Sequence, residues 1–270
     1  MTDLLAFLDA QWSWYLGCPR GQLHDGHKHV VARPQAASEK GSPWPLRRGP
    51  VVLFTTGHGW VMSLPEQLLG AARTSCLDLG FEELVREGDH LSQEWFDHPE
   101  MHFDRGAAGY RTMNRVAAPL KLRGWSHYVF WYCDPATWRP RPDEHVRLIT
   151  EHDADIWQQW LAWPGPMVGP HIRDQFEITD AFGYVLEGRL VSAAQIEASP
   201  EDFAWEYGVD TLADFRGRGF ATAVLNSVTT HIVAQGRVPW HYYNHYNRAS
   251  ARLPAKVGYF HYAEGLFGML

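Results

Sequence analysis

A bend at residues 214–224, DFRGRGFATAV, carries the residue types in this chain that are best suited to chemistry. Gly217 and Gly219 alternate there with Arg216 and Arg218, just before a run of helix-forming residues. Backbone N–H groups in such a bend can point at an anion, and the dipole of the following helix adds positive potential. Glycine matters because a side chain would keep phosphate oxygens away from the backbone. The bend is therefore either a phosphate cradle or a connecting turn.

Two common phosphate-binding motifs do not match this bend. The P-loop ends in GK[ST], and no Lys follows these glycines. The dinucleotide fingerprint G-x-G-x-x-G needs a third glycine at the position of Thr222. The neighbouring elements must therefore decide what the bend does.

The residues around the bend predict a strand, a helix and a second strand. The predicted elements are a strand at 203–211, a helix of about five turns at 218–236 closed by Gly236, and a strand at 238–246. A βαβ unit of this kind places its two strands in parallel. Further predicted elements are a strand at 146–150, a helix at 151–163, a hairpin at 181–198 turning at 187–189, a helix at 248–258 interrupted by Pro254, and a final strand at 259–270.

The first half of the chain reads as α/β or α+β, without a motif that we can link to chemistry. Its predicted elements are helices at 2–16 and 65–79 and strands at 49–56, 60–64 and 126–133. A proline-rich segment, CDPATWRPRPDEH, then follows at 133–145. We predict an N-terminal domain at 1–138, a linker at 139–144 and a second domain at 145–270.

Composition limits the class of protein. The chain has 270 residues, of which 45% are hydrophobic and 20% charged, as in folded globular proteins. Its net charge of −7 argues against nucleic acid or an anionic membrane as partner. Three widely spaced cysteines without a CxxC fit a reducing compartment. The first residues lack the basic start of a signal peptide, so we expect a cytoplasmic protein with no membrane contact.

Read with residues about thirty positions later, the bend resembles the acyl-CoA signature of the GNAT superfamily of N-acetyltransferases. The family pattern Q/R-x-x-G-x-G/A is matched by Arg216, Gly219 and Ala221. A second pattern, N-x-x-S/A followed by K-x-G-F/Y, is matched within NRASARLPAKVGY by Asn247, Ser250, Lys256, Gly258 and Tyr259. The resemblance covers about residues 145–270. It implies an α/β (α+β) fold with a mixed, splayed central sheet flanked by helices, and it suggests that the N-terminal α/β domain is a degenerate GNAT-like half.

The resemblance implies an acyl-CoA-dependent N-acyltransferase that transfers acetyl from acetyl-CoA to a primary amine. The acceptor is expected to be a small molecule, with a protein amine left open, and no metal is expected. The implied cofactor-binding residues are Val209, Asp210, Thr211, Arg216, Gly217, Arg218, Gly219, Phe220, Ala221, Thr222, Asn247 and Ser250. Among them, the backbone of Val209 and Thr211 would pair with the pantetheine arm, and the amides of 216–222 would hold the pyrophosphate.

Acyl transfer to an amine needs a base, because an alkyl ammonium has a pKa near ~10. Glu206, on the strand before the bend, is the predicted base, unless it is only an outward-facing strand residue. Asp210 shares its face and is the second candidate. The backbone N–H near Val209 is the oxyanion donor that the family implies.

The general acid is where this sequence departs from the family. Many members carry Tyr seven residues after the conserved Asn, where this chain has Pro254, which cannot donate a proton. Either another group serves, such as Tyr242, Tyr246 or Tyr259, or the thiolate leaves without help. The alternative function is a non-catalytic acyl-CoA-binding sensor.

Two histidine-rich stretches were weighed as metal sites. They contain His24, His27 and His29 in the first, and Asp97, His98, Glu100, His102 and Asp104 in the second. Neither has the HExxH pattern or a cysteine-containing zinc spacing, so we interpret both as solvated loops. A metal-dependent hydrolase built on this half is the weakest of the three functional hypotheses.

Overall fold

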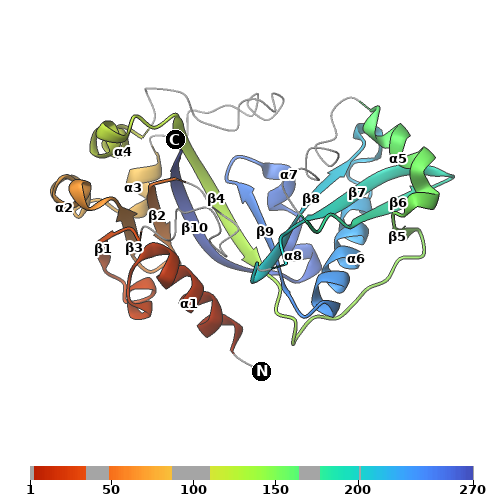
Figure 1. Ribbon diagram of the computed structural model, residues 1–270, viewed down its shortest axis with the longest axis horizontal. Helices are drawn as coiled ribbons and strands as arrows, with labels where there is room; N and C mark the ends of the chain where they lie inside the picture. The colour runs from red at the N-terminus through yellow and green to blue at the C-terminus, as the bar shows by residue number, and fades with distance from the viewer. Residues whose placement is uncertain (1–2, 35–48, 87–109, 164–176, 201, 270) are drawn as a thin grey trace. The chain divides into compact units, whose positions relative to one another are not determined.

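The computed structural model describes residues 3–34, 49–86, 110–163, 177–200 and 202–269 (Figure 1). Its contacts divide the chain into two compact units. The first comprises Met1–Phe130, Tyr242–Ala251 and Tyr262–Leu270, and the second comprises Trp131–His241 and Arg252–His261. The sequence predicts one boundary at 139–144, whereas the chain passes between these units several times. The domain division drawn from the sequence therefore stays a prediction.

The first unit contains a mixed sheet in the hydrogen-bonded order β1-β3-β2-β10-β4. Strand β1 pairs with β3 in parallel, while β2 is antiparallel to both β3 and β10. Its elements in chain order are α1 (Leu4–Leu16), η1 (Arg20–Leu23), β1 (Lys28–Ala32), β2 (Val51–Thr55), β3 (Trp60–Leu64), η3 (Glu66–Leu68), α2 (Leu69–Cys76), α3 (Phe81–Arg86), α4 (Arg111–Ala117), η6 (Ala118–Leu120), β4 (Gly124–Tyr132), α7 (Arg248–Ala251) and β10 (Phe260–Met269).

The second unit contains a mixed sheet in the order β9-β8-β7-β6-β5. Strands β5 to β8 are antiparallel neighbours, and β9 is parallel to β8, as the βαβ pattern predicts. Its elements are β5 (Val146–Leu148), η7 (Glu151–Asp153), α5 (Ala154–Leu161), β6 (Ala181–Leu186), β7 (Arg189–Glu197), β8 (Ala204–Thr211), η9 (Ala213–Phe215), α6 (Phe220–Ala234), β9 (Val238–Asn244) and α8 (Pro254–Val257). Strands β4, β9 and β10 have residues in both units. The predicted α/β class with mixed sheets flanked by helices is confirmed.

Aromatic packing holds α1 on the sheet of the first unit. Asp3 caps the helix by accepting a hydrogen bond from the Leu5 N–H, and Gly17 ends it with a left-handed φ of 77°. Trp12 stacks on Phe54 of β2 at 4.2 Å and lies 4.9 Å from Phe130 of β4. A second cluster, which includes residues of α2, α3 and α4, fills the rest of this core.

Helices cover the sheet of the second unit on both faces. Helix α6 packs Val224, Leu225 and Val228 into one cluster with alternate residues of β7 and β8. Trp160 of α5 packs with Leu190 and Ala193 in a separate cluster. The hairpin between β6 and β7 turns at Glu187 and Gly188, whose φ values of 51° and 75° are those of a type I′ turn.

Some short elements of the first unit were not predicted from the sequence. These are β1, α3 and α4. His29 therefore lies on strand β1 and not in a loop, which corrects the interpretation of that histidine stretch. The second histidine stretch, at 97–104, lies outside the described residues.

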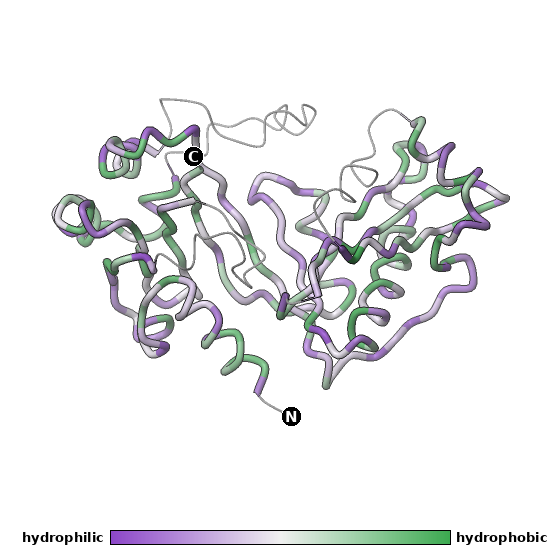
Figure 2. Tube along the Cα trace, viewed as in Figure 1, coloured by the Kyte–Doolittle hydropathy of each residue, from purple (hydrophilic) through white to green (hydrophobic). Residues whose placement is uncertain are grey.

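The predicted linker has neither a helix nor a strand between β4 and β5, and Figure 2 colours most of it as hydrophilic. The residue just before it, Trp138 of the proline-rich segment, contacts α6. The Trp138 indole N–H donates to Thr230 Oγ1 of α6 at 3.2 Å, and the ring is 9% exposed. No helix among the described residues is both long and apolar enough to span a membrane.

The three cysteines are free and buried. Burial raises the pKa of Cys18 and Cys76 to about 11 and that of Cys133 to about 12. Because the thiolate is the reactive form, these thiols are expected to be inert at neutral pH.

We expect a thiol reagent such as Ellman's reagent to label none of the three cysteines in the folded protein at pH 8. A thiol of pKa about 11 is ionised in only about one molecule in a thousand at that pH. Labelling should rise to three thiols per chain in urea, read by absorbance of the released chromophore. Rapid labelling of the folded protein would show that burial does not protect these groups.

Candidate functional site

Strand β8 is paired along its length on one edge only. Residues Glu206–Thr211 are in antiparallel register with β7. On the other edge, the register with β9 includes only Ala204 and Trp205. Strands β8 and β9 are thus in register at the start of β8, and their pairing ends before β8 does. A splayed sheet of this kind is what the family resemblance implies.

The hydrogen-bond pattern shows which backbone groups of β8 point away from β7. The Leu212 N–H donates to the Val191 carbonyl at 3.0 Å, so this pair is a hydrogen-bonded one. Such pairs alternate along an antiparallel ladder, so 210 and 208 also face β7. The N–H and C=O groups of Val209 and Thr211 therefore face the edge that β9 leaves.

Thr211 already has partners for these backbone groups. Its N–H donates to Asp210 Oδ1 at 3.2 Å, and its carbonyl accepts from Arg216 Nε at 3.1 Å. A ligand that pairs with Thr211 would have to displace both side chains. Val209 is consequently the better placed of the two predicted backbone contacts.

The bend after β8 places both of its glycines in the left-handed region. Gly217 has φ 75° and Gly219 has φ 91°. A Cβ built on either residue meets no described atom within 4 Å, so crowding is not what selects glycine here. The backbone conformation selects it, because φ near +90° is costly for other residues. The open side of the bend also leaves its amides accessible.

Helix α6 starts at this bend with its first amides unused by the helix. The Ala223 N–H donates to the Gly219 carbonyl, so the earlier N–H groups of 220–222 have no intrahelical acceptor. Gly219 is the N-cap residue, and among the described residues no side chain caps the helix. The Arg216 N–H, by contrast, is bonded to the Ala213 carbonyl. The Arg216 amide is therefore already bonded within the chain, and the predicted role of the amides of 217–222 in holding an anion stays a prediction.

Cationic and aromatic side chains surround the bend. The Arg218 guanidinium lies 5.0 Å from the Phe220 ring and 5.5 Å from the Phe215 ring. The guanidinium of Arg189, at the start of β7, lies 5.4 Å from the Phe215 ring and 4.6 Å from the Trp163 ring. Sequence reasoning missed Arg189, since its only signal was its place in the EGR turn.

Glu206 and Asp210 share the face of β8 that lies on the α5 side. Their partners across the ladder are Glu197 and Ala193, and Ala193 packs in the α5 cluster. Glu206 is half-buried and directly opposite Glu197, so two carboxylates repel each other when both are ionised. Gln195, 1% exposed, lies opposite Gly208 between the two predicted bases.

A pocket of about 500 Å³ opens on the same side of the second unit. Its lining residues are Ile156, Gln159, Trp160, Ala162, Trp163, Arg189, Leu190 and Leu212. Neither Glu206 nor Asp210 is among them. The lining residue that is nearest in sequence to these predicted bases is Leu212, two residues after Asp210. The pocket therefore does not by itself identify an acceptor site.

The second family motif begins with a helix cap. Asn247 accepts a hydrogen bond from the Ser250 N–H through Oδ1 at 3.0 Å, at the start of α7 in the first unit. The side-chain oxygen of Asn247 and the backbone N–H of Ser250 are therefore bonded to each other in a helix cap. Their predicted role in binding the cofactor stays a prediction.

The structure places Pro254 at the first position of α8, where proline is well tolerated. This confirms the predicted interruption between α7 and α8. Tyr259 is 4% exposed, and its hydroxyl lies 2.7 Å from Thr229 Oγ1 of α6. Burial raises the pKa of Tyr259 well above its usual range. Tyr259 is therefore a core residue with a poorly available proton.

The other two tyrosines considered as acids belong to the first unit. Tyr242 packs edge-on against Tyr128 at 5.3 Å, as part of an aromatic cluster with Phe130. The Tyr246 hydroxyl lies 3.4 Å from that of Tyr110. These contacts do not identify either tyrosine as the general acid.

The sequence model of the FR47-like protein family, which is related to the GNAT superfamily, matches residues 186–267. This segment includes the β8 edge, the bend, α6 and both predicted motifs. The resemblance drawn from the motifs is confirmed for this segment, which covers less than half of the chain. Comparison with curated proteins gave no match.

Several solved structures are similar to part of this chain. A GNAT-family protein from Novosphingobium aromaticivorans is 22% identical, covers 56% of this chain and 67% of its own, and has a TM-score of 0.45. A GNAT-family acetyltransferase from Colwellia psychrerythraea is 15% identical, with 61% and 63% covered and a TM-score of 0.43. A GCN5-related N-acetyltransferase-like protein from Streptococcus suis is 18% identical, with 61% and 69% covered and a TM-score of 0.41. The chain thus spans about two thirds of their length, and at this level of similarity we draw nothing from them about activity.

Substituting Gly219 by Ala should destabilise the protein by about 1–2 kcal/mol, because a Cβ is strained at φ 91°. The matched control is Gly21→Ala, where φ is not positive and no described atom is within 4 Å of the new Cβ. That change should be neutral or slightly stabilising. Urea midpoints of the two variants measure the difference, and equal midpoints would contradict the assignment of strain.

Proposed function

We propose that this protein is an acyl-CoA-dependent N-acyltransferase that transfers acetyl from acetyl-CoA to a primary amine. The acceptor in this proposal is a small molecule, and it attacks the thioester directly in a ternary complex. The single observation that carries the proposal is the bend between β8 and α6. It combines two left-handed glycines, uncapped helix amides and two arginines in one segment.

The residues of the bend fit the diphosphate of coenzyme A. The amides of 217–222 and the helix dipole supply donors and positive potential without a bulky side chain in the way. Arg216 and Arg218 add charge next to them. The backbone of Val209 is free to pair with an extended amide-containing arm, in the manner of an added strand, because it faces away from β7.

Acetyl-CoA supplies the activated acyl group, and the chain supplies the groups that move protons and stabilise charge. Glu206 accepts the proton of the acceptor ammonium, directly or through water, from its half-buried position. Asp210 is the second candidate on the same face. The Val209 N–H is the donor proposed for the developing oxyanion. No acid is assigned to the leaving thiolate.

The alternative is a sensor that binds acyl-CoA without catalysis. Two observations favour it: Pro254 occupies the position where many family members have the tyrosine acid, and Tyr259 is held in the core by its bond to Thr229. Both functions need the same cradle. The two functions differ only in whether the protein catalyses acyl transfer, so a measurement of turnover distinguishes them.

Coenzyme A should raise the melting temperature of the wild-type protein, and Gly219→Val should abolish this protection while the variant still unfolds cooperatively. A branched side chain at Gly219 blocks the approach of phosphate oxygens to the amides and strains the backbone. Gly21→Ala should keep the full shift. Thermal unfolding at several CoA concentrations measures the effect, and a retained shift in Gly219→Val would reject the cradle.

Glu206→Gln should lower the turnover number by about 10²–10⁴-fold while CoA protection is unchanged, as expected for the loss of a general base. The matched control is Glu197→Gln, which removes the same charge from the residue directly opposite and should retain most activity. The assay follows free thiol released from acetyl-CoA across a set of amines. The protein's own cysteines are buried and should not contribute.

Thiol release by neither the wild-type protein nor the control, with CoA protection intact, would favour the sensor. Equal activity in Glu206→Gln and Glu197→Gln would remove Glu206 from the mechanism and leave Asp210 to be tested next.

A further inference from the structure

Three side chains of the first unit that can ligate metals lie close together: His127 of β4, His245 just after β9, and Glu264 of β10. His127 Nε2 lies 3.0 Å from Glu264 Oε2, and His245 Nδ1 lies 3.9 Å from the same oxygen. All three ligand atoms are within 4.8 Å of one another. The cluster contains none of the residues of the proposed acyltransferase site.

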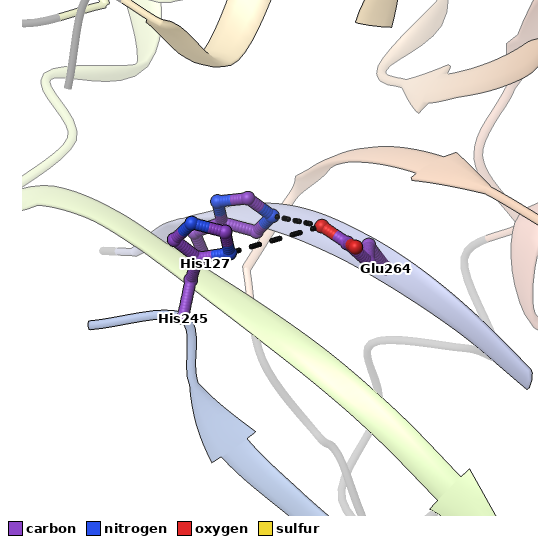
Figure 3. Close-up of side chains that lie close together, drawn as sticks. All are labelled: His127, His245 and Glu264. Carbon is purple, nitrogen blue, oxygen red and sulfur yellow. Dashed lines mark hydrogen bonds and ion pairs between the residues drawn. The ribbon is translucent and has the colours of Figure 1, made fainter. Parts of the chain in front are cut away.

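The two imidazole rings lie face to face, with centroids 4.4 Å apart and an interplanar angle of 4°. Figure 3 shows the carboxylate of Glu264 directed at a nitrogen of each ring. Two positively charged rings at this distance would repel each other. A cation bound by both neutral rings and the carboxylate would avoid this repulsion, because metal ligation uses the neutral imidazole and the ionised carboxylate.

The spacing of the ligand atoms suits a tetrahedral ion. Bonds of about 2.0–2.2 Å place two donors of a tetrahedral Zn²⁺ about 3.4 Å apart. The distances from Glu264 to the two imidazoles, 3.0 and 3.9 Å, lie on either side of this value. The His245 side chain is 43% exposed and can rotate to close the longer distance, whereas His127 is 4% exposed and fixed by its surroundings.

The backbone holds two of the ligands together before any ion binds. The His245 N–H donates to the His127 carbonyl at 2.8 Å. The ring of Phe81 from α3 packs at 5.9 Å, edge-on, against the His127 imidazole. The cluster is thus part of the sheet and its covering helix, and not a chance meeting of long surface side chains.

We propose that His127, His245 and Glu264 form a binding site for a divalent ion of the Zn²⁺ class, with a fourth position for water. Two imidazoles and one carboxylate favour Zn²⁺ and related transition metals over Mg²⁺ and Ca²⁺, which prefer oxygen ligands. Three protein ligands and a water are the set found in catalytic zinc sites, where structural sites have four protein ligands. The proposal revises the sequence-based expectation of no metal, and it stands whether or not the chain is an acyltransferase.

The test uses the full chain without an affinity tag, stripped of metal with a chelator. Isothermal titration with Zn²⁺ should give one equivalent bound. Co²⁺ should bind at the same stoichiometry and produce the visible absorption of a tetrahedral complex. The melting temperature should rise with Zn²⁺, since an ion that binds the folded chain stabilises it.

His245→Ala and Glu264→Gln should each weaken Zn²⁺ binding by at least about 100-fold, because loss of even an outer partner of a metal ligand costs about 10–100-fold. His245 is exposed, so its variant should fold normally, which circular dichroism checks. The matched control is His29→Ala. It removes another imidazole of the same unit that lies 2.9 Å from a carboxylate, that of Asp25, and it should leave Zn²⁺ binding unchanged.

No binding by the wild-type chain would overturn the proposal. So would binding that survives both His245→Ala and Glu264→Gln, or that falls equally in His29→Ala.

Discussion

The second unit depends on how strand β8 satisfies its backbone hydrogen bonds. One edge is bonded to β7 from Glu206 to Thr211, while among the described residues the register of the other edge with β9 includes Ala204 and Trp205. Backbone groups beyond that point must find water, a side chain or a ligand, since leaving them unpaired is costly. Thr211 uses the side chains of Asp210 and Arg216. The bend and the N-terminus of α6 follow directly, so one short stretch of chain carries most of the available amides of the site.

Long, periodic elements of the fold could be predicted from the sequence because their own residues determine them. Helix α6 has apolar residues at helical spacing and a glycine at each end, and the β6–β7 hairpin has Gly188 at a turn position with positive φ. The elements that escaped prediction are short and depend on their neighbours. Strand β1, KHVVA, is fixed by parallel pairing with β3, and α4 begins at Tyr110 in a left-handed conformation without a capping side chain. Local sequence contains no signal for either.

Some features of the candidate site could likewise be predicted from the sequence, and others could not. Motif spacing located the bend and its glycines, because those positions need a particular backbone conformation that few residues allow. Spacing could not show that the Arg216 amide is already bonded to Ala213, or that the Tyr259 hydroxyl meets Thr229 in the core. The cluster of His127, His245 and Glu264 was also beyond reach, since His127 and Glu264 are 137 residues apart in the chain. Only strand pairing brings such residues together.

Recognition through the main chain also explains why so few matching residues can define this family. An anion held by amides and a helix dipole places demands on φ at Gly217 and Gly219 and few on the surrounding side chains. The acceptor of the proposed reaction is different, because side chains on the α5 side of β8 would have to recognise it. Gln195 and Glu206 are on that side in the register of the ladder, and an amide and a carboxylate favour a cationic or hydrogen-bonding group over an anionic one. In the proposed reaction, binding of the acyl donor would therefore depend on backbone conformation, which a sequence motif preserves. Binding of the acceptor would depend on side chains, which such a motif does not specify.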